Sequence, residues 1–234
     1  MRSIRTVGRK SRPLRRLLTP RQFKETYTNE FLADRPNATY VEIGVQTGES
    51  FRTIRAARKL GVDPSRHPAM RSLRPGEEFF EQSSDDFFAD DAARVLRLGA
   101  VDVALVDGLH EFRQALRDVL NLERFMRPDG LIVIDDCNPT SRERAVDTFQ
   151  PGSWNGDVWK VVALLRRERP DLRTITVNAD QGIGLVTGFR GKTVRPDANT
   201  IDQYKELGYD LLERERQDIL GMVKPARIQD LIRA

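Results

Sequence analysis

The chain has 234 residues, 39% of them hydrophobic and 32% charged, with a net charge of +4 at neutral pH. This length and composition allow a substantial core and favour a single domain. No stretch reaches the roughly 18 uncharged apolar residues that a membrane span needs, and the start lacks the apolar segment of a secretory signal, so the sequence predicts a cytoplasmic protein without a membrane span. With Cys137 as the single cysteine, no disulfide can form within the chain.

Basic residues are concentrated at the start of the chain. Residues 1–21 hold eight of the 39 basic residues and none of the 35 acidic ones, so the remainder is mildly acidic. We expect residues 1–19 to form a flexible basic arm and residues 20–234 to form one folded domain. A basic arm can bind nucleic acid or a membrane surface, although such charge runs are more often solvated tails.

From residue 20 onward, apolar runs of strand length alternate with amphipathic runs of helix length. This alternation predicts an α/β fold with a doubly wound, mostly parallel sheet. The expected elements, in chain order, are a helix at 20–31, a strand at 40–44, a helix at 49–60, strands at 61–63 and 78–82, a helix at 85–97, a strand at 103–106, a helix at 112–126, a strand from 131 after a turn at 127–130, a helix at 158–167, and strands at 173–177 and 184–189.

The end of the chain departs from this alternation. The last two expected strands are close enough in sequence to pair antiparallel. Beyond them, apolar residues recur at helical spacing, namely at Ile201, Tyr204, Leu207, Leu211 and Leu212. We therefore expect a core at 40–189 and C-terminal helices at 200–233, which either pack on the body or contact a second copy of the chain.

Two glycines, Gly44 and Gly48, follow the first expected strand, where missing side chains let the backbone approach a ligand. A dinucleotide-binding fingerprint would have glycine at position 42. Glu42 would repel a pyrophosphate, which argues against a nicotinamide-dependent oxidoreductase and favours a cationic or hydroxyl-bearing cofactor. Asp63 ends the next strand, where a carboxylate can accept hydrogen bonds from a ribose; otherwise it forms a turn before Pro64.

Three carboxylates follow two other strands. Asp107 ends one strand, and Asp135 and Asp136 end the next along the chain. In a parallel sheet these ends meet at one edge. Three carboxylates held together there repel one another and destabilise the fold unless a cation is bound or a proton is shared. Oxygen ligands favour Mg²⁺. The alternative is that the three side chains bond backbone amides at the strand ends.

His110 lies three residues after Asp107. A neutral imidazole can take a proton from a hydroxyl near pH 7, so we predict His110 and Asp107 as catalytic residues; the alternative is that His110 caps the following helix. Trp154 precedes a later helix and offers an aromatic wall for a substrate, although a tryptophan in this position is more often part of the core.

Several of these motifs together resemble the class I S-adenosylmethionine-dependent methyltransferases. The resemblance covers residues 40–189, and within that superfamily the sequence is most similar to small bacterial methyltransferases related to macrocin and sugar O-methyltransferases. The matching stretches are YVEIGVQTGES at 40–50, GVDP at 61–64, SSDDFF at 83–88, DGLHEF at 107–112, DDCNP at 135–139 and NGDVWK at 155–160.

The resemblance implies a seven-stranded sheet whose last strand is antiparallel. It also implies positions for the cofactor, with the methionine end at Glu42, Gly44 and Gly48, the ribose at Asp63, the adenine near Ser84 or Asp85, and Asp107 nearby. In the metal-dependent members that this chain resembles, carboxylates at Asp107, Asp135 and Asp136 would hold a divalent ion, and His110 would be the general base. The macrolide-sugar type has glutamate where Asp135 stands.

The predicted function is methyl transfer from S-adenosylmethionine to an oxygen of a small molecule, such as a sugar or a glycosylated natural product, with Mg²⁺ as a possible aid. The alternative is a nucleic-acid-binding or cofactor-sensing module with a methyltransferase-like fold and a basic arm. Methylation of base amines is disfavoured because DCNP at 136–139 lacks the aromatic residue that stacks on a flipped base.

Overall fold

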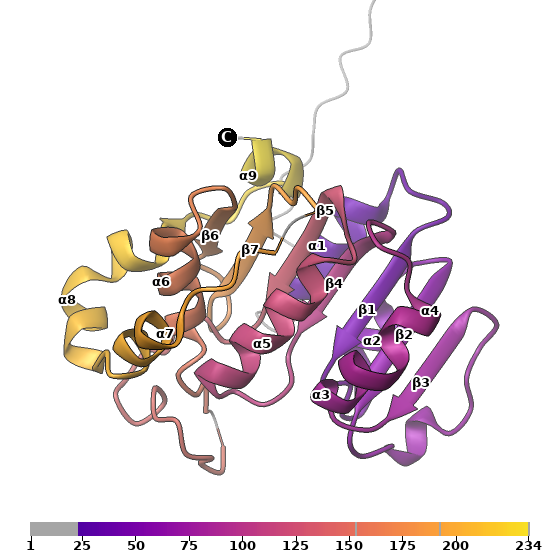
Figure 1. Ribbon diagram of the computed structural model, residues 1–234, viewed down its shortest axis with the longest axis horizontal. Helices are drawn as coiled ribbons and strands as arrows, with labels where there is room; N and C mark the ends of the chain where they lie inside the picture. The colour runs from indigo at the N-terminus through magenta and orange to yellow at the C-terminus, as the bar shows by residue number, and fades with distance from the viewer. Residues whose placement is uncertain (1–22, 153, 192, 234) are drawn as a thin grey trace, which may run out of the picture.

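The computed structural model describes residues 23–152, 154–191 and 193–233. A sheet of eight strands forms its centre, and Figure 1 shows helices α5 and α6 in front of this sheet and α1 behind it. The predicted arm at 1–19 lies outside the described residues. Within the described ranges, no helix combines the length and the apolar character that crossing a bilayer requires.

The bounds of the elements are as follows. The strands are β1 (Thr39–Ile43), β2 (Arg58–Asp63), β3 (Glu77–Glu81), β4 (Val101–Val106), β5 (Met126–Ile134), β6 (Arg173–Val177), β7 (Ile183–Thr187) and β8 (Met222–Val223). The helices are α1 (Phe23–Leu32), α2 (Glu49–Thr53), α3 (Ser84–Asp86), α4 (Ala92–Val95), α5 (Phe112–Glu123), α6 (Trp159–Glu168), α7 (Ala198–Lys205), α8 (Tyr209–Leu220) and α9 (Ile228–Arg233), with a 3₁₀ turn at Pro68–Met70 and a π-helical segment at Phe87–Asp91.

The strand order is β3-β2-β1-β4-β5-β7-β6-β8. Neighbouring strands are parallel, except that β7 runs antiparallel to both β5 and β6. The predicted doubly wound sheet and its antiparallel seventh strand are confirmed. The expected count of seven strands is wrong, because β8 adds a short strand beside β6; its two residues are too few for a pattern to reveal.

Side chains of the central strands alternate between two hydrophobic clusters, one on each face of the sheet. On β5, Ile132 and Ile134 belong to the cluster that includes α5 and α6, whereas Leu131 and Val133 belong to the cluster that includes α1 and α9. Burial on both faces explains why β5 is a continuous apolar run in sequence. The strand order reverses between β1 and β4, and doubly wound sheets bind ligands at the carboxyl ends of such a pair.

The helix expected over 49–60 is wrong after Thr53. Ile54 has extended backbone, and Arg58–Asp63 forms β2, which pairs with both β1 and β3. The segment has good helix formers in Arg58, Lys59 and Leu60, but pairing on both sides of β2 decides its conformation.

Other boundaries also differ from the sequence prediction. The helix expected at 85–97 is divided into α3, the π-helical segment and α4. β5 begins at Met126 and includes the residues expected to form a turn at 127–130. They fit within the strand because the register of β4 and β5 shifts here, with Val101 paired to Met126 and Val103 to Leu131. The expected C-terminal helices are α7, α8 and α9; α7 and α8 pack on α6, so they cover the body, and contact with a second copy stays a prediction.

Candidate functional site

A cavity of about 800 Å³ opens at the carboxyl ends of β1, β2 and β4, at the reversal of strand order. Seven of the predicted site residues line it, namely Glu42, Gly44, Asp63, Ser84, Asp107, His110 and Trp154. The other predicted residues do not line it, namely Gly48, Asp85, Asp135 and Asp136. Most of the predicted cofactor residues therefore share one cavity, although they come from four separate stretches of the chain.

The turn after β1 is shaped by glycine. Gly44 has a φ of +86°, and a Cβ at this position would lie 2.1 Å from the backbone oxygen of Asp107. Glycine is therefore required where the ends of β1 and β4 approach each other. Gly48 also has a positive φ, but a Cβ there would meet the sulfur of Met70, so Gly48 allows packing against Met70 rather than access to the cavity.

Replacing Gly44 by alanine should lower the free energy of unfolding by more than about 3 kcal/mol, because the new Cβ meets backbone atoms in a strained conformation. Chemical denaturation measures this loss. Gly191→Ala is the matched control, since Gly191 has a φ of +70° and a Cβ added there would have open space within 4 Å. Equal losses in the two variants would mean that φ alone, not the approach to Asp107, explains the effect.

Asp63 holds the turn as well as lining the cavity. Its Oδ2 accepts hydrogen bonds from the backbone N–H of Val45 at 2.9 Å and of Gln46 at 2.8 Å. Its Oδ1 accepts one from Ser65 at 2.8 Å, which is the turn that the sequence allowed as an alternative. Asp63 therefore fixes the floor of the cavity beside the position predicted for a ribose.

One end of the cavity is acidic. Glu42 is buried, and its Oε2 accepts a hydrogen bond from the Tyr40 hydroxyl at 2.7 Å. Burial raises the pKa of Glu42 to about 8, with a contribution from the charge of Asp107, although the Tyr40 hydrogen bond opposes the shift. Glu25 of α1 lies at the same end; its Oε1 accepts from Ser50 at 2.6 Å, and its buried Oε2 has no hydrogen-bond partner among the described residues. Two carboxyl groups at this end suit a cationic ligand group.

Gln114 and Asp118 of α5 line the cavity beside Ser84. The Gln114 side-chain amide donates to Ser84 Oγ at 3.0 Å and to Asp118 Oδ1 at 3.2 Å. Burial raises the pKa of Asp118 to about 7, because the hydrogen bonds from Ser84 and Gln114 compensate only in part. Asp85 instead interacts with Gln114 and Arg117 outside the cavity. Of the two residues predicted for the adenine end, Ser84 faces the cavity.

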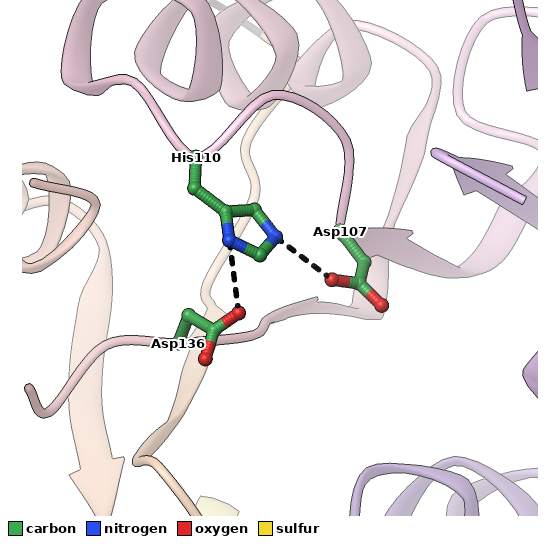
Figure 2. Close-up of side chains that lie close together, drawn as sticks. All are labelled: Asp107, His110 and Asp136. Atoms are coloured by element: carbon green, nitrogen blue, oxygen red, sulfur yellow. Dashed lines mark ion pairs between the residues drawn. The ribbon is translucent and has the colours of Figure 1, made fainter. Parts of the chain in front are cut away.

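His110 lies between two carboxylates, as Figure 2 shows. Its Nε2 is 3.4 Å from Asp107 Oδ1, and its Nδ1 is 3.2 Å from Asp136 Oδ2. Burial opposes the charged ring, but the hydrogen bond to Asp107 and the charge of Asp136 outweigh it and raise the pKa of His110 to about 9. This arrangement favours the protonated ring, whereas the sequence led us to expect a neutral imidazole.

The three predicted metal-binding carboxylates are divided between two cations. Lys24 of α1 donates to Asp107 Oδ2 at 2.6 Å and to Asp135 Oδ2 at 2.5 Å. Asp136 turns away from this pair, since its Oδ1 accepts from Asn155 at 2.8 Å and its Oδ2 faces His110. Burial opposes the charge of Lys24, yet the two carboxylates outweigh it and raise its pKa above the usual range.

A divalent ion was predicted at Asp107, Asp135 and Asp136. Among the described residues, the group whose ligand atoms lie close enough for an ion is instead Asp107, His110 and Asp136, within 4.8 Å of one another. Both ring nitrogens of His110 already face carboxylate oxygens, and the outer oxygen of Asp107 faces the Lys24 ammonium. This donor set does not fit an oxygen-ligated Mg²⁺ while Lys24 is in place.

Aromatic side chains form the wall of the cavity next to His110. Trp154 stacks on the His110 ring with centroids 5.2 Å apart and meets Phe149 edge-on at 5.4 Å. Its indole N–H donates to the backbone oxygen of Val146 at 2.7 Å, which fixes the ring. Leu109 and Phe149 also line the cavity and are 59% and 68% exposed. The cavity therefore has an apolar rim on the His110 side.

Lys24, Glu25, Gln114 and Asp118 were not predicted from the sequence. The first two belong to a helix far from the cavity motifs in sequence, and no local pattern marks them. A signal did exist for Asp118, because it interrupts the apolar face of α5 between the buried residues Ala115 and Val119.

Comparison with known proteins gives a family and a fold. Residues 41–137 match the family model of the methyltransferase domain. No curated protein matches the chain. An S-adenosylhomocysteine-bound methyltransferase of Podospora anserina, PaMTH1, is 18% identical with a TM-score of 0.50, over 70% of this chain and 77% of its own. A Staphylococcus aureus protein assigned as a caffeoyl-CoA O-methyltransferase is 13% identical with a TM-score of 0.50, over 70% of this chain and 81% of its own.

At these identities the two solved structures show a shared fold alone. The family match covers β1 to β5, the stretch that contains Glu42, Asp63, Asp107 and His110. These findings agree with the resemblance to methyltransferases that the sequence motifs indicated, whereas the likeness to the macrocin-related subfamily stays a prediction. Residues 41–137 of the chain thus match the methyltransferase domain family, and the chain shares its fold with an S-adenosylhomocysteine-bound methyltransferase.

Proposed function

We propose that the protein transfers the methyl group of S-adenosylmethionine to a hydroxyl oxygen of a small molecule. The observation that carries this proposal is the composition of a single cavity. Its acidic end suits the cationic part of the cofactor, and His110, held by Asp107 and Asp136, lies on the side with the aromatic rim.

The cavity residues fit the cofactor. Glu42 and the unpartnered oxygen of Glu25 would hold its ammonium group, and Asp63 would face the ribose. Ser84 and Asp118 offer polar atoms for the adenine edge. When bound, the cofactor supplies an electrophilic methyl group on a sulfonium. The positive charge of the bound cofactor would in turn favour the ionised form of Glu42, whose pKa burial raises to about 8.

His110 would take the proton of the acceptor hydroxyl. A hydroxyl becomes a strong nucleophile only when its proton is removed or shifted toward a base. Asp136, 3.2 Å from Nδ1, orients the ring and stabilises its protonated form, and Nε2, whose contact with Asp107 is the longer at 3.4 Å, would take the proton. Because the pKa of His110 is raised to about 9, the base form of the ring becomes more abundant as the pH rises toward that value.

The rim indicates the kind of acceptor. Leu109, Phe149 and Trp154 present apolar surface beside His110, and such surface packs against the face of a sugar or aromatic ring. A sugar or a glycosylated natural product, as in the macrocin-related methyltransferases that the motifs resemble, is our proposed acceptor. The S. aureus structural neighbour is named for an aromatic acceptor, so ring-bearing hydroxyl compounds of both kinds belong in a screen.

Three predictions made from the sequence stay open. Help from Mg²⁺ would require Lys24 to leave Asp107 and Asp135. Binding of nucleic acid by a basic arm falls on residues 1–19, outside the described ranges, and no feature of the described residues favours it. The cytoplasm remains the proposed location.

Calorimetric titration with S-adenosylhomocysteine tests the proposed function. We expect micromolar binding to the wild type and at least about tenfold weaker binding to Asp63→Ala, which loses both the ribose partner and the two amide contacts of the turn. Asp218→Ala is the matched control, because Asp218 is exposed on α8 and does not line the cavity. A folded wild type that does not bind would refute the proposal; one that binds justifies the acceptor screen, run with EDTA and with Mg²⁺.

A further inference from the structure

Lys24 occupies the meeting point of two strand-end carboxylates. Its Nζ lies 2.6 Å from Asp107 Oδ2 and 2.5 Å from Asp135 Oδ2, and these carboxylates come from the neighbouring strands β4 and β5. The three side chains are 12% to 21% exposed, so the contact is shielded from solvent. Among the charges of the described cavity, this ammonium is the one placed between the ends of β4 and β5.

The surrounding structure holds Lys24 in this position. Its neighbour Glu25 is bonded to Ser50 of α2, and Tyr27 and Phe31 of the same helix are buried against the sheet. Side chains on both faces of the first turns of α1 thus make contacts with the body of the protein. Lys24 cannot leave its position without breaking its ion pairs with Asp107 and Asp135. Removing one partner of such a pair leaves buried charge uncompensated.

A divalent ion and this ammonium would compete for one place. Mg²⁺ needs close to six oxygen ligands at about 2.0–2.1 Å, and an ammonium can neither ligate it nor tolerate its charge nearby. The ammonium already offsets part of the repulsion between Asp107 and Asp135, because its charge lowers the pKa of Asp135 against the effects of burial and of Asp107.

Building on the proposed function, we propose that the Lys24 ammonium takes the place of the divalent cation at the ends of β4 and β5, so that this protein acts without a metal ion. Two ammonium hydrogens go to Asp107 and Asp135, and the third is directed at an acceptor oxygen in the cavity that Lys24 lines. Lys24 thereby positions that oxygen beside His110 and favours its ionised form.

Binding of Mn²⁺, followed by the loss of its free electron paramagnetic resonance signal, tests the proposal directly. We expect no binding to the wild type at millimolar Mn²⁺. Lys24→Met frees Asp107 and Asp135, so this variant should bind Mn²⁺ with a dissociation constant on the order of 10⁻⁴ to 10⁻³ M. The double variant Lys24→Met/Asp135→Asn removes a required ligand and should lose that binding again.

Two further variants sharpen the result. Lys24→Arg keeps the positive charge and should exclude Mn²⁺ as the wild type does, whereas Lys224→Ala removes an exposed lysine outside the cavity and should change nothing. Stoichiometric Mn²⁺ binding by the wild type, or equal exclusion by Lys24→Met, would overturn the proposal.

Two other readouts separate this proposal from the proposed function. Binding of S-adenosylhomocysteine by each variant reports an intact cofactor site. If the wild type did not bind it, the proposed methyl transfer would be refuted, but the Mn²⁺ measurements would still decide the role of Lys24. Once an acceptor is found, wild-type turnover should be unchanged by EDTA, and Lys24→Met should raise KM for the acceptor more than it changes cofactor affinity. Loss of turnover on removing metal would contradict the role given to Lys24.

Discussion

Replacing His110 by glutamine should lower kcat by about 100- to 10,000-fold, the range that loss of a general base produces. Glutamine keeps a polar group of similar size between Asp107 and Asp136 but cannot accept the proton of the acceptor. Affinity for S-adenosylhomocysteine should stay close to that of the wild type, because the acidic end of the cavity is unchanged. Steady-state kinetics and calorimetry on the same preparation measure both quantities.

The chain offers a matched control in His67, its other histidine, which is exposed and does not line the cavity. His67→Gln should leave kcat unaltered. In the wild type, kcat should rise with pH up to about 9, because the base form of His110 is the reactive one. Asp136→Asn removes one of the two carboxylates that raise the pKa of the ring, so it should move this rise to lower pH. A variant without His110 that kept most of its turnover would exclude it as the base.

Replacing Glu42 by glutamine should have opposite effects on binding and on stability. The affinity for S-adenosylhomocysteine should fall by about 10- to 100-fold, the worth of a hydrogen bond to a charged group. The stability effect follows from the pKa of Glu42, which burial raises from 4.5 to about 8. Between these two values the unfolded chain releases the proton more readily than the folded one, so ionisation favours unfolding as the pH rises.

Glutamine cannot ionise, yet its side-chain oxygen can still accept from Tyr40. The advantage of Glu42→Gln in free energy of unfolding should therefore grow from about pH 5 and level off above pH 8, reaching a few kcal/mol, since one pKa unit corresponds to about 1.4 kcal/mol. Denaturation at several pH values, with calorimetry alongside, checks both effects. Glu213→Gln on the exposed side of α8 is the control and should show neither. Weaker binding without a gain in stability at pH 8 would mean that burial of ionised Glu42 does not lower the free energy of unfolding.

The residues that sequence reasoning located are those at strand ends. Glu42 and Asp63 lie at the ends of β1 and β2, and Asp107 directly follows β4. Parallel strands bring such ends to one edge, so local pattern and topology together predict a shared cavity. The comparison with known families then supports the kind of cofactor. His110 belongs to the same group, because it lies in the loop after β4, three residues beyond Asp107.

The part that could not be predicted depends on contacts between distant segments. Lys24 and Asp107 are 83 residues apart, and no periodicity in α1 shows that its first turn reaches the ends of β4 and β5. The direction in which a strand-end side chain points cannot be predicted from sequence either. The sequence analysis therefore grouped Asp135 with Asp136, although Asp135 faces Lys24 and Asp136 faces His110. The helix expected at 49–60 failed for a related reason, since ladder pairing of β2 outweighed local helix preference.

The adjacency of Lys24 and Glu25 has a consequence for where the catalytic unit begins. The family match starts at residue 41, yet these two neighbours on α1 both line the cavity, where Lys24 pairs with Asp107 and Glu25 accepts a hydrogen bond from Ser50. In the proposed function, one turn of helix would therefore act on both the acceptor and the cofactor. A shortened protein that began at β1 would keep the sheet's strand-end edge but would lose a charge of each sign from the cavity, so the proposed function requires α1 as well as the matched residues.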